Sequence, residues 1–212
     1  MSDATSSLVF IVDDDDEVRR ALARLVRSAG YHVEAFESAG SFLNDADLLS
    51  RPACLLLDLQ LPDVSGLELQ REVRMILPVI FITGHGDIPT SVTAMKAGAA
   101  DFLPKPICDT VLLEVIEHSL VLAVEMFKHR RELTDIQGRL NRLTPREREV
   151  MALVVTGRLN KQVASELGTT EKTVKIHRAR VMEKMEANSL ADLVRIADKA
   201  GICAGDRKWT LH

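Results

Sequence analysis

The stretch that decides the fold reads CLLLDLQLPDVSG and covers residues 54–66. Its first four residues form an almost continuous apolar run, which is typical of a strand buried on both faces of a parallel sheet. Asp58 follows where that strand ends, and Gly66 marks the boundary with a helical pattern. The stretch therefore predicts a buried strand with an acidic side chain at its carboxyl end.

The same pattern recurs on both sides of this stretch. Four more compact apolar runs are Leu8–Val12, Val33–Phe36, Val79–Thr83 and Asp101–Leu103. Between the runs, apolar residues have helical spacing. Five strands that alternate with helices predict a doubly wound α/β domain with a five-stranded parallel sheet.

Residues 109–143 have a helical pattern in which apolar residues step by three and four. The basic cluster Lys128–Arg131 interrupts this pattern and leaves two short stripes. Two interpretations stay open. The segment is either the last helix of the α/β domain followed by a helical linker over residues 123–142, or one continuous helix that dimerises or transmits a signal.

Residues 143–212 contain no strand-like run and predict an all-α domain of four helices. Thr144, Pro145 and Glu147 match the N-cap, the first-position proline and the capping-box acid of a helix that should stop near Gly157. The expected boundaries of the next three helices are an N-cap at Asn160, an N-cap at Thr170 and a stop at Gly201.

The charge is divided between the two predicted domains. Residues 1–138 carry 12 Lys and Arg against 22 Asp and Glu, whereas residues 139–212 carry 15 against 9. An acidic half joined to a basic half indicates different partners, and the basic half is a candidate for binding nucleic acid. A solvated charged face would explain a modest imbalance equally well, so motifs must decide.

The sequence predicts a cytoplasmic protein without a membrane segment. No apolar run reaches the length of a membrane span, and the N-terminus lacks a secretory pattern. The three cysteines are far apart and form no CxxC motif, which suits a reducing compartment.

Polar residues stand at the ends of several predicted strands. Asp13 and Asp14 follow the first strand, Asp58 ends the third, Thr83 ends the fourth, and Lys105 follows the fifth. The carboxyl ends of neighbouring parallel strands converge on one crevice. Carboxylates held together there repel one another unless a cation is present, and Mg²⁺ prefers such oxygen ligands. Each residue alone would more often be a helix cap or a surface group, but four consistent strand ends predict a site.

These residues carry a family resemblance. The segments VDD at 12–14, LDLQLPDVSG at 57–66, ITGHGD at 82–87 and FLPKP at 102–106 resemble the receiver domain of bacterial two-component response regulators, over about residues 7–122. The resemblance implies a flavodoxin-like fold. It also implies that Asp58 accepts a phosphoryl group from a sensor histidine kinase.

The resemblance assigns further roles in this pocket. It implies that Mg²⁺ is held by Asp13, Asp14, Asp58 and the backbone carbonyl of Gln60. It also implies that Lys105, followed by a cis bond to Pro106, contacts the phosphoryl group, and that Thr83 and Phe102 form the switch.

One spacing departs from the receiver pattern. Only 25 positions separate Asp58 from Thr83, a few fewer than is usual in receivers. Either the third helix, near Arg71–Pro78, is truncated or frayed, or residues are absent from this sequence.

The C-terminal half shows the layout of a helix-turn-helix, with small residues at a helix crossing and a glycine turn. The segments LTPREREV at 143–150, NKQVA at 160–164 and TVKIH at 173–177 resemble the LuxR-type helix-turn-helix, over about residues 142–201. Joined to a receiver, this resembles the NarL/FixJ class of response regulators. It implies phosphate contacts from Lys161 and Thr173, and a position at the DNA groove for Lys175, His177 and Arg178.

The exposed side of the second helix of that motif is expected to be basic. Besides the three groove residues, it offers Lys172, Arg180 and Lys184. Contacts from such side chains to DNA phosphates would give salt-dependent affinity.

The leading hypothesis is a transcription factor, not an enzyme, with a receiver at 1–122, a helical linker at 123–142 and a DNA-binding domain at 143–212. Phosphorylation is expected to promote a homodimer through the receiver face that contains Phe102, and to tighten binding to double-stranded DNA. A second hypothesis makes the receiver a constitutive interaction module. A third makes the C-terminal half an enzyme, although it lacks a concentrated cluster of catalytic groups.

Overall fold

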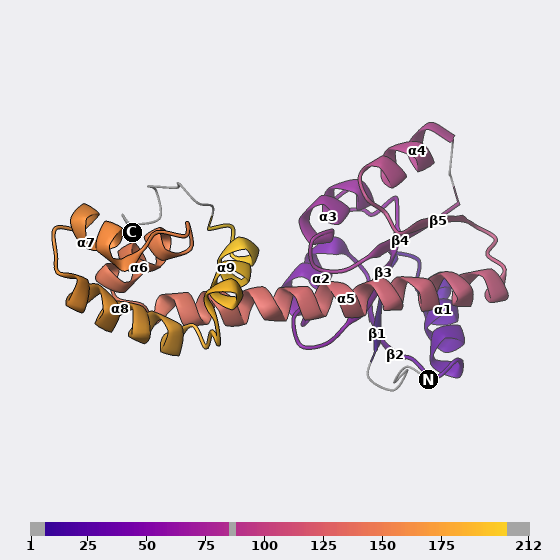
Figure 1. Cartoon of the computed structure of the whole chain (residues 1–212). Coiled ribbons are helices and arrows are strands. Elements are labelled where there is room, and N and C mark those ends of the chain that lie inside the picture. The colour runs from indigo at the N-terminus through magenta and orange to yellow at the C-terminus, as the bar shows by residue number, and fades with distance from the viewer. Residues whose placement is uncertain (1–6, 85–87, 203–212) are drawn as a thin grey trace. The chain divides into compact units, whose positions relative to one another are not determined.

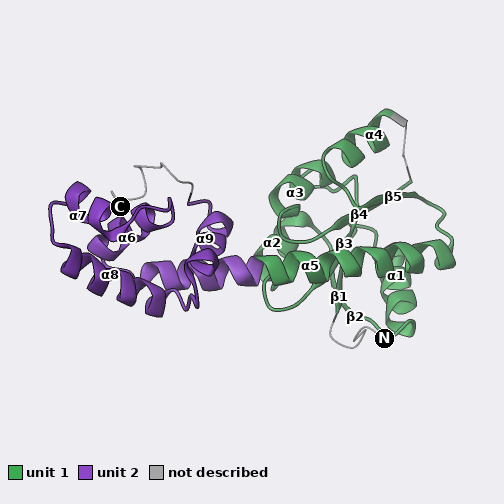
Figure 2. Cartoon of the chain, viewed as in Figure 1, with its two compact units in different colours: residues 1–129 green, residues 130–212 purple. Residues whose placement is uncertain are grey.

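The computed structural model of the chain describes residues 7–84 and 88–202. The motif residues His85, Gly86 and Asp87 lie outside the described residues, as does the tail that follows Ile202. The chain divides into two compact units, Met1–His129 and Arg130–His212 (Figure 2). Each unit is described by itself.

The first unit is the predicted doubly wound α/β fold. Its strands are β1 (Leu8–Val12), β2 (His32–Phe36), β3 (Ala53–Asp58), β4 (Val79–Thr83) and β5 (Asp101–Pro104). They form one parallel sheet in the order β2-β1-β3-β4-β5. Its helices are α1 (Asp16–Ser28), α2 (Ala39–Asp45), α3 (Gly66–Val73), α4 (Ile88–Lys96) and the first part of α5 (Asp109–Asn141). The predicted fold class is confirmed.

Helices cover both faces of this sheet (Figure 1). Alternate residues of β1 point to opposite faces, so Phe10 packs with Phe42 of α2, whereas Ile11 packs with Val26 of α1 and Ile116 of α5. All five side chains are fully buried. Each contributes about 1.5–3 kcal/mol through burial, which explains why the strands are nearly continuous in apolar residues.

The short spacing before β4 is accommodated by a short helix. Helix α3 has eight residues and ends at Val73. The carbonyl of Val73 accepts hydrogen bonds from Ile76 and Leu77, and the Leu77 side chain is buried in the core. The chain thus enters β4 directly after one tight turn.

Helix α5 is a single element of 33 residues, as the continuous interpretation expected. Leu112 and Ile116, near its start, are buried in the core of the first unit. Ile136 and Leu140, near its end, are buried in the core of the second unit. The division between the units falls inside the segment 123–142.

Over its described residues, 130–202, the second unit contains helices and no strands. Besides the end of α5, it contains α6 (Pro145–Val154), α7 (Asn160–Glu166), α8 (Glu171–Lys184) and α9 (Leu190–Lys199). The capping box of α6 is formed as expected: Glu147 N donates to Thr144 Oγ1 at 3.3 Å, and Thr144 N donates to Glu147 Oε2 at 2.9 Å.

The predicted N-cap at Asn160 is wrong, because Asn160 is the first residue of α7 and Leu159 is the cap residue. The side chain of Gln162 accepts the hydrogen bond from Leu159 N at 2.8 Å. The Asn160 side chain is engaged elsewhere, since its oxygen accepts a hydrogen bond from Arg178. The other two predicted boundaries agree: Thr170 caps α8, and Gly201 follows α9 with a φ of 70°.

Within residues 7–84 and 88–202, no helix combines the length and the apolar character that crossing a bilayer would require.

Candidate functional site

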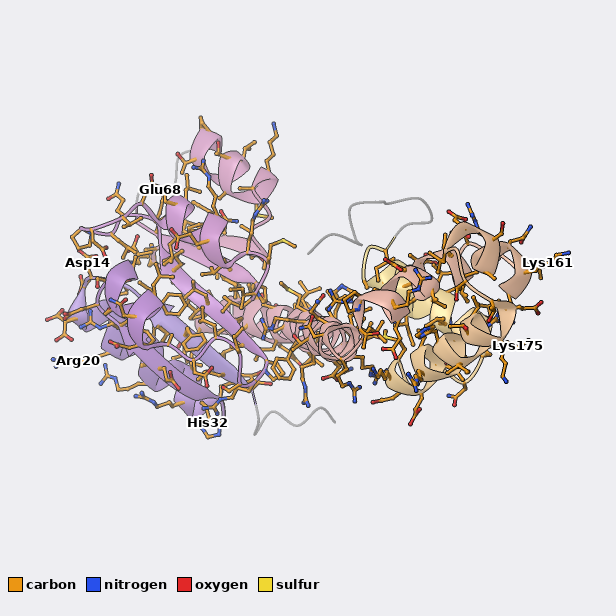
Figure 3. The ribbon with its side chains drawn as sticks, turned by 90° about the vertical axis from the view of Figure 1, so that its left-hand side faces the viewer. Asp14, Arg20, His32, Glu68, Lys161 and Lys175 are labelled. Atoms are coloured by element: carbon orange, nitrogen blue, oxygen red, sulfur yellow. The ribbon has the colours of Figure 1, made fainter. Side chains whose placement is uncertain are left out.

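The carboxyl edge of the sheet brings the predicted acidic residues together. Oxygen atoms of Asp13, Asp14 and Asp58 all lie within 4.8 Å of one another. Asp13 is buried, Asp58 is half-buried and Asp14 is exposed, and Figure 3 shows Asp14 at the surface of the first unit. The cluster is therefore reachable from solvent although its deepest member is not.

Lys105 joins two of these acids. Its Nζ donates to Asp13 Oδ2 at 2.8 Å and to Asp58 Oδ2 at 2.7 Å. Burial lowers the pKa of Lys105, but the two carboxylates outweigh burial and hold it above its ordinary value. The pKa of Asp13 is raised by burial, which Lys105 and the N–H of Asp15 only partly offset. The pocket holds more negative than positive charge. An additional cation would therefore reduce the repulsion between its carboxylates.

The donor set fits Mg²⁺. Three carboxylates whose oxygens lie within 4.8 Å of one another supply hard oxygen ligands, which this ion requires. One oxygen of Asp13 and one of Asp58 bind Lys105, and the other oxygen of each accepts a backbone N–H, from Asp15 at 2.9 Å and from Gln60 at 3.0 Å. These contacts fix the orientation of both carboxylates.

A glycine is required beside Asp58. A Cβ at Gly66 would lie 2.5 Å from the backbone oxygen of Asp58 and 3.0 Å from Cα of Leu59. Gly66 N donates to the carbonyl of Leu59 at 3.0 Å. The start of α3 therefore lies directly against the backbone that carries Asp58, and only glycine leaves room for it.

Arg19 is a residue of this site that the sequence reasoning missed. Its Nη1 donates to the carbonyls of Asp13 at 2.7 Å and Asp14 at 3.3 Å, and its Nη2 donates to Asp16 Oδ1 at 2.9 Å. It fixes the backbone of the loop that carries the first two acids. A basic residue one helical turn into α1, just after an acidic run, was the available signal.

Thr83 and Phe102 occupy the neighbouring strands β4 and β5, with Phe102 paired to Phe81. Thr83 is buried at the end of β4, and its carbonyl accepts a hydrogen bond from Lys105 N at 2.8 Å. Phe102 is half-buried in β5, with its ring centroid 6.2 Å from that of Phe81. The Lys105–Pro106 peptide bond is cis, as the resemblance implies.

The candidate DNA-contacting residues lie on α7 and α8. Lys161 and Lys175 are exposed, and Figure 3 shows both extending from the outer surface of the second unit. Thr173 is half-buried, with its hydroxyl 2.9 Å from that of Thr170. Lys175 lies 3.6 Å from Glu171 on the same helix.

His177 and Arg178 are both half-buried, whereas the prediction placed them on an exposed basic face. Arg178 Nη1 donates to Asn160 Oδ1 at 3.2 Å and so ties α8 to the start of α7. The Nδ1 atom of His177 is buried and has no hydrogen-bond partner within the described residues. The Arg178 side chain therefore helps to join the two helices of the motif.

The prediction that Lys184 belongs to the exposed basic face is wrong. Its Nζ donates to Oε2 of Glu147 at 2.6 Å, and Glu147 is only 1% exposed. Burial raises the pKa of Glu147, but hydrogen bonds from Lys184 and Thr144 outweigh burial and leave it below its ordinary value. The pair ties the start of α6 to the end of α8. The sequence offered Glu147 as a capping acid but gave no sign of this second, distant partner.

Comparison with known proteins identifies both halves of the chain. Residues 9–117 match the family model described as "Response regulator receiver domain", and residues 141–197 match "Bacterial regulatory proteins, luxR family". Nodulation protein W of Bradyrhizobium diazoefficiens is 47% identical, with 98% of this chain and 92% of that protein covered. The transcriptional regulatory protein FixJ of Rhizobium meliloti is 44% identical over 93% of this chain and 98% of its own.

Solved structures agree with these relatives. The response regulator StyR has a TM-score of 0.74 and is 44% identical, and the match covers 92% of this chain and 99% of that one. Full-length FixJ from B. japonicum has a TM-score of 0.52 and is 40% identical, with 92% and 98% covered.

Proposed function

Since the chain belongs to the two-component response regulators of the NarL/FixJ class, we propose that Asp58 is the phosphoacceptor of its phosphorylation-controlled transcriptional switch. The observation that carries this proposal is the contact of Lys105 with both Asp13 and Asp58, at 2.8 and 2.7 Å. It brings a nucleophilic carboxylate, a second carboxylate and a cation to one crevice.

In this proposal Mg²⁺ is held by Asp13, Asp14, Asp58 and the backbone carbonyl of Gln60. When bound, the ion offsets the negative charge that gathers on the phosphoryl group during transfer. The side chains of Asp58 and Lys105 then take part in the transfer. Asp58 forms the new P–O bond as the bond between phosphorus and the kinase histidine breaks, and Lys105 stabilises the phosphoryl oxygens.

The switch is proposed to use Thr83 and Phe102. Thr83 ends β4 at the carboxyl edge of the sheet, and Phe102 lies in the neighbouring strand β5, paired with Phe81 two positions before that edge. A phosphoryl group on Asp58 offers new acceptor oxygens to the Thr83 hydroxyl. Movement of Thr83 changes the packing of its neighbours, including the half-buried ring of Phe102.

The output is proposed to be sequence-specific binding of double-stranded DNA. Lys161, Thr173 and Lys175 would contact phosphates or the groove, while His177 and Arg178 position α8 as well as lining the groove. We further propose a receiver at 1–122, a helical linker at 123–142, a DNA-binding domain at 143–212, a cytoplasmic location, and no substrate turnover. Phosphorylation would produce a homodimer through the receiver face that contains Phe102.

The acceptor is tested by incubating the full chain with acetyl phosphate and Mg²⁺ and measuring the phosphoryl adduct by intact-protein mass spectrometry. The wild type and the control Asp45→Asn, which removes an exposed acid at the end of α2, should be labelled equally. Asp58→Asn should stay unlabelled. Equal labelling of Asp58→Asn would show that another residue accepts the group.

Dimer formation is tested on the same samples by sedimentation velocity. The phosphorylated wild type should sediment as a dimer and Asp58→Asn as a monomer. A wild type with one sedimentation coefficient in both states would exclude a phosphorylation-driven dimer.

A further inference from the structure

The end of α5 is part of the core that supports α8. Ile136 and Leu140 are 4% and 2% exposed, and they belong to the same apolar cluster as Val181 and Met185 at the end of α8. Residues 130–140 precede the segment that matches the LuxR family model, 141–197. The second unit therefore contains a structural element that the family match does not cover.

Helix α8 ends in a Schellman cap. Glu186 N donates to the carbonyl of Glu183 at 3.1 Å, and Ala187 N donates to the carbonyl of Met182 at 3.0 Å. Such a cap needs one residue with positive φ, and here that residue is Glu186, with a φ of 56°.

The choice of residue at this cap is unusual for the molecule. Within the described residues, Glu186 is the one non-glycine with positive φ. The positive-φ glycines are Gly30, Gly98, Gly157, Gly168 and Gly201. A residue with a Cβ is disfavoured in this conformation. The cap of α8 therefore retains a side chain at some cost, which points to a role for that side chain.

Two arginines of α5 and the turn after it hold this side chain. Arg139 Nη2 lies 3.0 Å from Glu186 Oε2, and Arg142 Nη2 lies 3.0 Å from Glu186 Oε1. Hydrogen bonding from Arg142, followed by the charge of Arg139, lowers the pKa of Glu186. The carboxylate thus stays ionised between its two partners.

The same arginines bind the end of the α8 backbone. Arg139 Nη1 donates to the carbonyl of Met185 at 3.3 Å, and Arg142 Nη2 donates to the carbonyl of Lys184 at 3.1 Å. Carbonyls at a helix end lack partners within the helix and carry partial negative charge. Each arginine therefore contacts both the cap side chain and the helix terminus.

We propose that Arg139, Arg142 and Glu186 form a clamp that positions α8 for DNA binding by fixing its C-terminal end to the end of α5. This inference rests on the proposed role of α8 as the helix that enters the DNA groove. Under this proposal, residues 130–142 contribute to DNA binding because they hold α8 in position. The three clamp residues are positioning residues, and none of them needs to touch DNA.

Two opposing effects of Glu186 make the proposal testable. DNA is an anion, so removal of an acidic charge near its binding surface strengthens association on electrostatic grounds. Loss of the clamp weakens association instead. Glu183 provides the matched control, because it is an exposed acid on the same helix.

The experiment uses the full chain with acetyl phosphate and Mg²⁺, and a labelled duplex that the wild type has selected from a random pool. Fluorescence anisotropy measures the affinity for that duplex. Glu183→Gln should bind as tightly as the wild type or slightly tighter. Glu186→Gln and Glu186→Gly should bind about five- to tenfold more weakly.

Thermal unfolding separates positioning from folding. Glu186→Gly relieves the disfavoured backbone conformation, so its melting temperature should equal or exceed that of the wild type while its affinity falls. Arg139→Ala combined with Arg142→Ala should weaken binding to a similar extent. Adding Glu186→Gly to that double variant should have little further effect, because the three residues act as one unit.

The outcomes are distinct. Affinities of Glu186→Gly and Glu186→Gln equal to that of Glu183→Gln would overturn the clamp, even though DNA binding itself stands. A wild type that selects no duplex would overturn the proposed DNA-binding function and the clamp with it. Effects of Glu186→Gly and the double arginine variant that add fully would show that they act independently, which also contradicts the clamp.

Discussion

The acidic pocket and the DNA-contacting surface are assembled in different ways. Lys105 reaches Asp13, 92 positions away in the sequence, and Asp58, 47 positions away. The candidate DNA-contacting residues instead lie within residues 161–178, on the consecutive helices α7 and α8. The pocket therefore exists only when β1, β3 and β5 have joined one sheet, whereas the candidate DNA-contacting surface depends on how α7 and α8 are held.

This difference predicts where substitutions act. In the pocket, loss of one contact should impair the chemistry directly. In the helical unit, loss of a supporting contact should first change stability or affinity. The following variants test that contrast, beginning with the largest expected effect.

Lys105→Met should slow phosphorylation of the chain by acetyl phosphate roughly 100-fold, because a preorganised cation is lost from the reacting centre. The rate is measured by the time course of the adduct in intact-protein mass spectrometry at fixed Mg²⁺. Lys96→Met, which removes an exposed lysine at the end of α4, is the control and should react at the wild-type rate. A Lys105→Met rate within twofold of wild type would remove Lys105 from the mechanism.

Gly66→Ala should lower the free energy of unfolding of the first unit by about 1–3 kcal/mol, because the new Cβ overlaps the backbone of Asp58. It should also slow phosphorylation roughly tenfold by displacing that backbone. Gly138→Ala is the matched control. Its Cβ meets nothing within 4 Å, and alanine favours the helix, so this variant should gain up to about 1 kcal/mol. Urea unfolding measures both, and equal stability of the two variants would contradict the close approach.

Lys184→Met should destabilise the helical unit by about 1–2 kcal/mol, since it leaves the buried carboxylate of Glu147 without its cation. Lys175→Met should have almost no effect, because its partner Glu171 is exposed and 3.6 Å away. Thermal unfolding at neutral pH compares them.

The contribution of Glu147 to the free energy of unfolding should depend on pH. The pKa of Glu147 is lower in the folded chain than its ordinary value, so the folded state binds fewer protons there. The stabilisation is present above the unfolded pKa and is lost as pH falls through the folded pKa. Between those two pKa values, the free energy of unfolding of Lys184→Met should fall less with decreasing pH than that of the wild type. Parallel pH profiles would mean that Lys184 does not lower this pKa.

Arg19→Ala should weaken Mg²⁺ binding by a smaller factor, roughly threefold, because it loosens the loop that carries Asp13 and Asp14 without removing a ligand. Arg20→Ala is the control, since Arg20 pairs with Asp16 but its side chain is 74% exposed. Isothermal titration calorimetry with Mg²⁺ measures both affinities. Equal affinities would limit Arg19 to a structural role in α1.

The sequence predicted features that depend on local pattern. Apolar runs placed Asp13, Asp58 and Thr83 at strand ends, and the parallel connection then brought those ends together. Thr144 and Glu147 were identified as a capping box because that motif is complete within four residues. In each case the physical cause lies close to the residue in the chain or follows from the order of strands.

Features that depend on distant contacts were missed. Lys184 looks like a solvated lysine in sequence, and only the packing of α6 against α8 directs it to Glu147. Asn160 looks like an N-cap, but Leu159 is the cap residue and the Gln162 side chain accepts its backbone N–H. Glu186 in a left-handed conformation has no local signal, because its two arginine partners lie more than 40 positions earlier.

The contact of Lys105 with Asp13 and Asp58 also sets when the acidic pocket can form during synthesis of the chain. Lys105 leaves the ribosome after Asp13, Asp58 and Thr83, and domains fold as units from the N-terminus. Asp58 of a nascent chain therefore lacks the contact with Lys105 until β5 has docked. From then on the acidic pocket can be complete while α7 and α8 are still being synthesised, so the pocket forms before the candidate DNA-contacting surface.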